Sequence, residues 1–184
     1  MNNNNQYQRN YNSSAYHSQD KNLADDYETP EWLFKYIQKK FAVTVDISGD
    51  THNTKIPGSP LYDKGFNALD VDWGQYPGTK FCFPPFSKPF FSQFLSKAHY
   101  EWQNGESTLL IAPMKTISVD YFQNVRAPKI YVVYPRVNFG YNGRDVNAPD
   151  AICLLHYDAT INNFIVPDLE FLDIKQFIPS SQRR

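Results

Sequence analysis

Two segments with helical spacing of apolar residues, set among short apolar runs, constrain the fold of this chain more than any other feature. Large apolar side chains recur at helical spacing over residues 30–40 and again over 88–103. Strand-length runs rich in β-branched and aromatic residues occupy 42–48, 80–83, 107–113, 129–134, 136–141 and 150–157. This alternation predicts an α/β fold with a mixed, mostly parallel sheet, flanking helices and antiparallel strands late in the chain.

Residues that favour helix ends and turns separate these elements. Thr29 is a good N-cap and Pro30 fits the first helical position, so the first helix is predicted to begin there. Ser118 is expected to cap a short helix that follows the run at 107–113. Residues 49–78 are rich in Gly, Pro, Asn and Asp and are predicted to be mostly loop.

The length of 184 residues fits one domain with tails. Residues 1–24 are rich in Asn, Ser and Gln without an apolar period, which predicts a disordered arm. The arm is either inert or a weak contact to nucleic acid, because Arg9 and Lys21 lie among tyrosines that can stack on bases. We expect the domain over 25–160 and a C-terminal extension over 161–184.

The chain has 18 Lys and Arg against 19 Asp and Glu, and this balance excludes a histone-like polybasic binder. A local basic face on DNA remains compatible with it. No apolar run has the length of a membrane span and no apolar leader is visible, so we expect a soluble cytoplasmic protein. The four His and two Cys show no metal-ligand spacing, so we expect no metal.

The most specific local feature is the sequence Phe-Cys-Phe-Pro-Pro-Phe-Ser at 81–87. A strand that ends in Pro-Pro-aromatic places a rigid loop at the carboxyl edge of a sheet, where open α/β sheets bind ligands. The prolines fix the backbone and leave carbonyl oxygens without competing N–H groups. A neighbouring aromatic ring can stack on a planar ligand. The other interpretation is a stiff connection without a ligand.

Further motifs surround this loop in a fixed order. They are Tyr-Glu-Thr-Pro-Glu-Trp-Leu-Phe at 27–34, Val-Asp at 45–46, Ala-Leu-Asp at 68–70 with Trp73, Leu-Leu-Ile-Ala-Pro-Met-Lys-Thr at 109–116, Arg-Val-Asn-Phe-Gly at 136–140 and Asn-Ala-Pro at 147–149. Taken together, the ordered set resembles the phage-encoded DNA adenine-N6 methyltransferase (Dam-like) family. The resemblance covers roughly residues 27–157.

The resemblance implies a Rossmann-like methyltransferase fold that uses S-adenosylmethionine (SAM) to methylate N6 of a flipped adenine in DNA. It also implies three groups of site residues: Tyr27, Thr29, Pro30 and Asp46 for the cofactor, Pro84, Pro85 and Phe86 for the base, and Arg136, Phe139 and Gly140 for the base or the DNA. Specificity is expected from the loops at 49–67 and 140–149. Each of these residues also has an explanation without a ligand. Thr29 and Pro30 can simply start a helix, Asp46 can be an acid that caps a turn, and Arg136 can be a solvated charge at a strand edge.

Phe83 occupies the catalytic position at which the resembled family has Asn or Asp. The lone pair of adenine N6 is delocalised into the ring, so an Asn or Asp oxygen accepts one amino hydrogen and a proline-loop carbonyl accepts the other. Phe83 offers no side-chain acceptor. Loss of one such positioned group typically lowers the rate by about 10²–10³-fold.

Three hypotheses follow from this departure. An active methyltransferase uses another acceptor, such as Ser87 or Asp63. A catalytically inactive homologue keeps DNA, SAM or protein binding without methyl transfer. An interaction protein reuses the fold with neither ligand, and its cleft is then filled, for example by Phe83.

Overall fold

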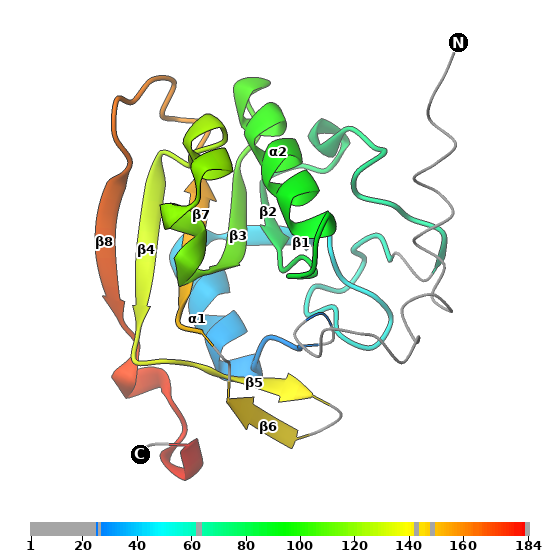
Figure 1. Cartoon of the computed structure of the whole chain (residues 1–184). Helices are drawn as coiled ribbons and strands as arrows, with labels where there is room; N and C mark the ends of the chain where they lie inside the picture. The colour runs from blue at the N-terminus through cyan, green and yellow to red at the C-terminus, as the bar shows by residue number, and fades with distance from the viewer. Residues whose placement is uncertain (1–24, 26, 62–63, 142–143, 148–149, 183–184) are drawn as a thin grey trace.

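The computed structural model describes residue 25 and residues 27–61, 64–141, 144–147 and 150–182 (Figure 1). The predicted arm at 1–24 and the candidate acceptor Asp63 lie outside the described residues.

A six-stranded sheet forms the centre of the molecule, in the order β1-β2-β3-β7-β4-β8. Its strands are β1 (Val43–Asp46), β2 (Thr79–Cys82), β3 (Thr108–Pro113), β4 (Lys129–Tyr134), β7 (Ile152–Tyr157) and β8 (Asp168–Asp173). β7 is antiparallel to both of its neighbours, and the other neighbouring pairs are parallel. The prediction of a mixed, mostly parallel α/β sheet is confirmed. Five strands therefore end at the same carboxyl edge.

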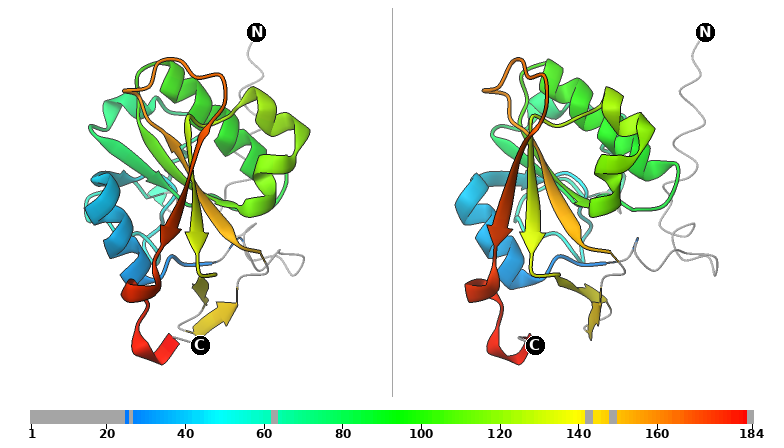
Figure 2. Two further views of the ribbon diagram at one scale, coloured as in Figure 1. Left: turned by 90° about the vertical axis from the view of Figure 1, so that its left-hand side faces the viewer. Right: turned by 60° about the vertical axis from the view of Figure 1, so that its left-hand side comes forward.

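Helices cover both faces of this sheet, which gives three layers (Figure 2). α1 (Glu31–Phe41) buries Leu33, Phe34, Ile37 and Phe41 against one face. α2 (Phe90–Gln103) buries Phe91, Phe94, Leu95 and Ala98 against the other. Both sets recur every three or four residues, so the helical spacing in the sequence identified the buried faces correctly.

Two predicted helix starts are wrong in detail. α1 begins at Glu31 with Pro30 as its N-cap, and no side chain caps it, although Thr29 was expected to do so. The short helix expected after Ser118 is replaced by two 3-10 turns, Met114–Ser118 and Asp120–Asn124. The Ser118 hydroxyl donates to the Lys115 carbonyl and thus ends the first turn instead of opening a helix.

Two strands were not predicted from the sequence. β6 (Arg144–Asn147) pairs antiparallel with β5 (Asn138–Tyr141), and this hairpin follows β4 at the carboxyl edge of the sheet. β8 lies in the expected C-terminal extension and forms the outer edge of the main sheet. Three of its six residues are acidic, and only Leu172 is buried, so burial does not alternate along this strand.

Short 3-10 turns complete the described elements, at Trp73–Gln75, Lys175–Phe177 and Ser180–Gln182. The first of these lies in the segment that was predicted to be mostly loop. Among the described helices, none has the length and apolar character needed to cross a membrane.

Candidate active site

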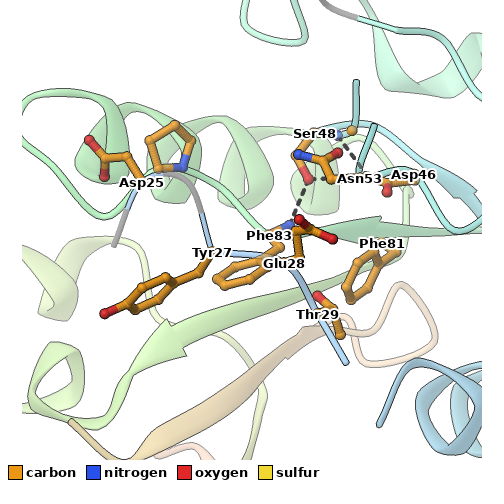
Figure 3. Close-up of a pocket in the computed structure, with 11 residues that line it drawn as sticks. Asp25, Tyr27, Glu28, Thr29, Asp46, Ser48, Asn53, Phe81 and Phe83 are labelled. Atoms are coloured by element: carbon orange, nitrogen blue, oxygen red, sulfur yellow. Dashed lines mark hydrogen bonds between the residues drawn. The ribbon is translucent and has the colours of Figure 1, made fainter. Parts of the chain in front are cut away.

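The carboxyl ends of β1 and β2 border a narrow hollow, which Figure 3 shows in close-up. Its closed part has a volume of about 30 Å³, which holds a water molecule or two. The lining residues are Asp25, Tyr27, Glu28, Thr29, Asp46, Ser48, Gly49, Asn53, Phe81, Phe83 and Pro85. They include three carboxylates and no Lys or Arg, so the described lining favours a ligand with positive charge or hydrogen-bond donors.

Asp46 ends β1 with its side chain buried beneath the turn that follows the strand. Its carboxylate accepts from the backbone N–H of Ser48 (3.0 Å) and from the Ser48 hydroxyl (3.2 Å). The N–H groups of Gly49 and Lys55 donate to it as well. Burial raises the pKa of Asp46 to about 6, although these hydrogen bonds oppose the rise. The carboxylate thus holds the turn after β1 in place.

The turn after β1 is packed tightly on Asp46. A Cβ atom added at Gly49 would lie 2.8 Å from Oδ2 of Asp46 and 2.8 Å from Cβ of Thr54. Further along the turn, the Asp50 N–H donates to Oδ1 of Asn53 over 2.8 Å. Asn53 therefore reaches the hollow with its oxygen already bonded within the turn.

Ser48 connects this turn to the loop after β2. Its hydroxyl donates to Asp46 and accepts a hydrogen bond from the Phe83 N–H over 2.7 Å. One hydroxyl thereby links the ends of two neighbouring parallel strands. The position of the proline loop depends on it, since Phe83 is the first residue of that loop.

The Phe83 ring is half-buried in a cluster of aromatic rings. Its centroid lies 5.1 Å from that of Phe139 and 5.4 Å from that of Phe86. Phe139 in turn stacks on Tyr27, with centroids 5.6 Å apart and planes 15° apart. Phe86 also meets Phe91 of α2 edge to face. These contacts hold Phe83 on the wall of the hollow. Its side chain has no polar atom, so it offers a ligand no hydrogen bond.

The rest of the proline loop is held by packing and by one carboxylate. Pro84 is buried, and Pro85 lines the hollow. The Ser87 N–H donates to Oδ1 of Asp25 over 2.8 Å, which ties the loop to the segment that precedes α1. Ser87, one of the two predicted alternative acceptors, is not among the residues that line the hollow.

The segment before α1 crosses the carboxyl edge of the sheet. Glu28 and Gly140 exchange two backbone hydrogen bonds, of 2.8 and 2.9 Å, as an isolated antiparallel bridge. This bridge brings Tyr27 and Thr29 to the hollow beside Asp46, as the cofactor prediction requires. Pro30 lies at the start of α1 and is not among the lining residues.

The predicted DNA-binding residues lie on the loop and strand that follow β4. Arg136 is exposed, whereas Phe139 is 0% exposed and packs beneath Tyr27 and Phe83. Gly140 forms the bridge to Glu28. Arg136 is thus accessible to a phosphate. Phe139 does not line the hollow itself but packs against Tyr27 and Phe83, which do. The roles assigned to all these site residues stay predictions.

Cys82, the residue before Phe83, is fully buried, and burial raises the pKa of its thiol well above the usual range. A buried thiol with a raised pKa is a poor nucleophile. Cys82 belongs to the hydrophobic core beneath α2.

Four polar residues of the hollow were not predicted from the sequence, namely Asp25, Glu28, Ser48 and Asn53. Ser48 follows Asp46 by two residues, which is the spacing at which an Asp side chain bonds the backbone of a turn, so a signal for it existed. The sequence carries no corresponding signal for Glu28, because its partner Gly140 is far away in the chain.

The mixed sheet, with polar and proline loops that line one hollow at its carboxyl edge, defines the class as an α/β protein with its site beyond the ends of β1 and β2. A family model described as DNA N-6-adenine-methyltransferase (Dam) matches residues 17–153. The chain belongs to this family, which confirms the resemblance to DNA adenine-N6 methyltransferases. A search of curated proteins finds no match. The matched segment runs from before α1 into β7 and leaves β8 outside.

Proposed function

We propose that the chain is a SAM-dependent DNA adenine-N6 methyltransferase whose methyl donor and target base meet at the hollow beyond the carboxyl ends of β1 and β2. The family assignment supports the reaction class. The observation that carries the proposal is that the polar turn after β1 and the proline loop after β2 line the same space. Ligands of open α/β sheets bind at this edge.

The lining residues fit the chemistry of SAM, which supplies a methyl group activated by a positively charged sulfur when it is bound. The Tyr27 and Phe83 rings offer faces that attract a cation. Asn53 uses its oxygen within the turn, so its Nδ2 group is the donor for a ligand carboxylate. Because the closed volume is about 30 Å³, binding requires the lining side chains to move apart.

The DNA side of the proposal uses the proline loop and Arg136. The Pro84 carbonyl accepts one hydrogen of the N6 amino group, and the Phe86 ring packs against the flipped base. Arg136 follows β4 at the same carboxyl edge and is exposed, so its guanidinium suits a phosphate of the DNA backbone. The hollow itself carries acidic side chains, so the phosphates are expected to stay outside it.

A second candidate is a catalytically inactive homologue that retains SAM, DNA or protein binding. Two observations favour it: Phe83 brings no acceptor to the loop, and its ring narrows the hollow. The two candidates differ in one outcome, the formation of N6-methyladenine.

The test incubates the full chain with unmethylated genomic DNA and SAM, digests the DNA and measures N6-methyladenine by mass spectrometry. Phe83→Asn is assayed in parallel, with circular dichroism to show that it folds. Titration calorimetry with SAM tests the cofactor separately.

Methylation by the natural chain supports the proposal. Saturable SAM binding with methylation by Phe83→Asn alone selects the inactive homologue. The absence of SAM binding at millimolar concentration, together with the absence of methylation by both chains, would refute the methyltransferase and the SAM-binding form of the inactive homologue.

A further inference from the structure

Glu28 places a carboxylate in the hollow for which the proposed function has given no role. We propose that this carboxylate is the acceptor for the adenine N6 amino group that Phe83 does not provide. The inference rests on the proposed function, because it assigns a catalytic residue of the same reaction.

The Phe83 side chain cannot supply the acceptor. The Phe83 ring packs against Phe86 and Phe139, with centroids 5.4 and 5.1 Å away. Its backbone N–H is already donated to Ser48. An acceptor for the second amino hydrogen therefore has to come from another chain segment that reaches the hollow.

The other acid and amide oxygens of the described lining are engaged in holding the fold. Asp46 accepts four hydrogen bonds from the turn after β1 and lies buried beneath it. Oδ1 of Asp25 accepts from the proline loop, and Oδ1 of Asn53 accepts from Asp50. Redirecting any of these oxygens to a base would release part of the site.

The Glu28 carboxylate is engaged by no hydrogen bond or ion pair with another residue in the described part of the chain. Figure 3 shows it pointing into the hollow, between Phe83 and Asn53. Free acceptor capacity on a half-buried carboxylate is costly unless a donor reaches it. An amino group with two hydrogens is a donor of the required kind.

The backbone of Glu28 is fixed, which is a requirement for a catalytic group. Its N–H and carbonyl both bond to Gly140. A Cβ atom at Gly140 would lie only 3.3 Å from Cβ of Glu28 and 3.9 Å from its carboxyl carbon. The absence of a side chain at Gly140 thus leaves room for the Glu28 side chain on that side.

The reaction needs hydrogen-bond acceptors before methyl transfer and releases a proton after it. N6 forms a bond to the methyl carbon, the bond from that carbon to sulfur breaks, and its electron pair stays on sulfur. N6 then carries an excess proton, which passes to the Glu28 carboxylate and from there to water. Before transfer, the same oxygen and the Pro84 carbonyl draw the two amino hydrogens out of the ring plane, which takes the N6 lone pair out of conjugation with the ring.

The experiment compares the natural chain with Glu28→Ala, Glu28→Gln, Phe83→Asn and the double variant Glu28→Ala with Phe83→Asn. Glu31→Ala is the matched control, because Glu31 lies three residues away on α1, exposed and paired with Lys35 at 3.5 Å. For each chain, kcat for N6-methyladenine formation at saturating SAM and Kd for SAM by calorimetry are measured.

We expect Glu28→Ala to lower kcat by about 10²–10³-fold without changing Kd for SAM. Glu28→Gln keeps an oxygen acceptor and should lose less. Adding Phe83→Asn to Glu28→Ala should recover turnover, because Asn restores an acceptor at the loop. Glu31→Ala should match the natural chain.

Three results would overturn the assignment of Glu28 while leaving the proposed function in place or modified. In the first, Glu28→Ala turns over like the natural chain. In the second, it weakens SAM binding at unchanged kcat, which would make Glu28 a cofactor ligand. In the third, the natural chain binds SAM but only Phe83→Asn methylates. If the natural chain binds no SAM, the proposed function fails first, and the assignment fails with it.

Discussion

The backbone N–H of Phe83 donates a hydrogen bond to the Ser48 hydroxyl over 2.7 Å, which connects the end of β2 to the turn after β1. The same hydroxyl donates to Asp46, so the buried acid, the turn and the proline loop form one connected unit. A substitution at Asp46, Ser48 or Phe83 is therefore expected to disturb the positions of the other two residues.

Ser48→Ala should lower the free energy of unfolding by about 1–3 kcal/mol, because it leaves the half-buried Phe83 N–H without its partner. It also removes one donor from Asp46. Urea denaturation followed by tryptophan fluorescence measures the change. Ser118→Ala is the control, since this exposed hydroxyl bonds only the end of a 3-10 turn and its loss should have little effect. Equal effects of the two substitutions would contradict the role of Ser48.

Asp46 should make stability fall as pH rises through the weakly acidic range. Burial raises its folded-state pKa from 3.8 to about 6, so between these values the unfolded chain loses the proton first. The unfolded state then binds fewer protons than the folded state, and the free energy of unfolding decreases with pH. The full loss attributable to Asp46 above this window is about 3 kcal/mol.

Asp46→Asn isolates this titration from that of the other acids. The stability of the natural chain relative to the variant should decline from pH 4.5 to pH 7, as judged from urea midpoints across the series. A difference that does not vary with pH would show that Asp46 ionises in the folded state as it does in the unfolded state.

The loss of stability on breaking the ion pair between Lys80 and Glu106 should depend on which partner is removed. The Lys80 side chain is 0% exposed, whereas that of Glu106 is 28% exposed. Glu106→Ala leaves a buried ammonium without its counter-charge, with an expected loss of about 3–5 kcal/mol. Lys80→Met leaves a carboxylate that water can reach, so we expect a smaller loss. Denaturant midpoints decide the order, and the reverse order would refute this account.

Arg136→Ala should weaken DNA binding and make it less dependent on salt. If Arg136 contacts one phosphate, the slope of log K against log salt should fall by about 1. Arg126→Ala is the matched control, because Arg126 precedes β4 and Arg136 follows it, at opposite ends of the strand. Fluorescence anisotropy with duplex DNA at several salt concentrations measures both slopes. An equal fall for both variants would indicate a diffuse charge effect instead of a contact.

The parts of the fold that depend on side-chain burial were predictable from the sequence. α1 and α2 bury one face each, and the inner strands are apolar throughout, as in β3. β8 was missed because it is an edge strand in which only Leu172 is buried, so its sequence shows no burial period. β6 was missed because it pairs with β5 alone, outside the main sheet. Leu169 and Phe171 of β8 are exposed, which disguises the strand further.

The candidate site was predictable to the extent that motifs mark the ends of strands. Asp46 and the Pro84-Pro85 pair follow β1 and β2, and parallel pairing of these strands brings them together. Glu28 was not predictable, because only the bridge to Gly140 places it there. Helix caps and strand ends are local properties, whereas a contact between segments so distant in the chain depends on the completed sheet.

The position of β7 has a consequence for how the chain is assembled. β7 lies antiparallel between β3 and β4, so these two strands have no contact through the sheet until residues 152–157 insert between them. During synthesis, a nascent chain that ends before Ile152 holds β1, β2 and β3 as one fragment and β4 apart from it. The late strand therefore joins the two parts, and the central sheet forms cooperatively only after residues 152–157 have left the ribosome.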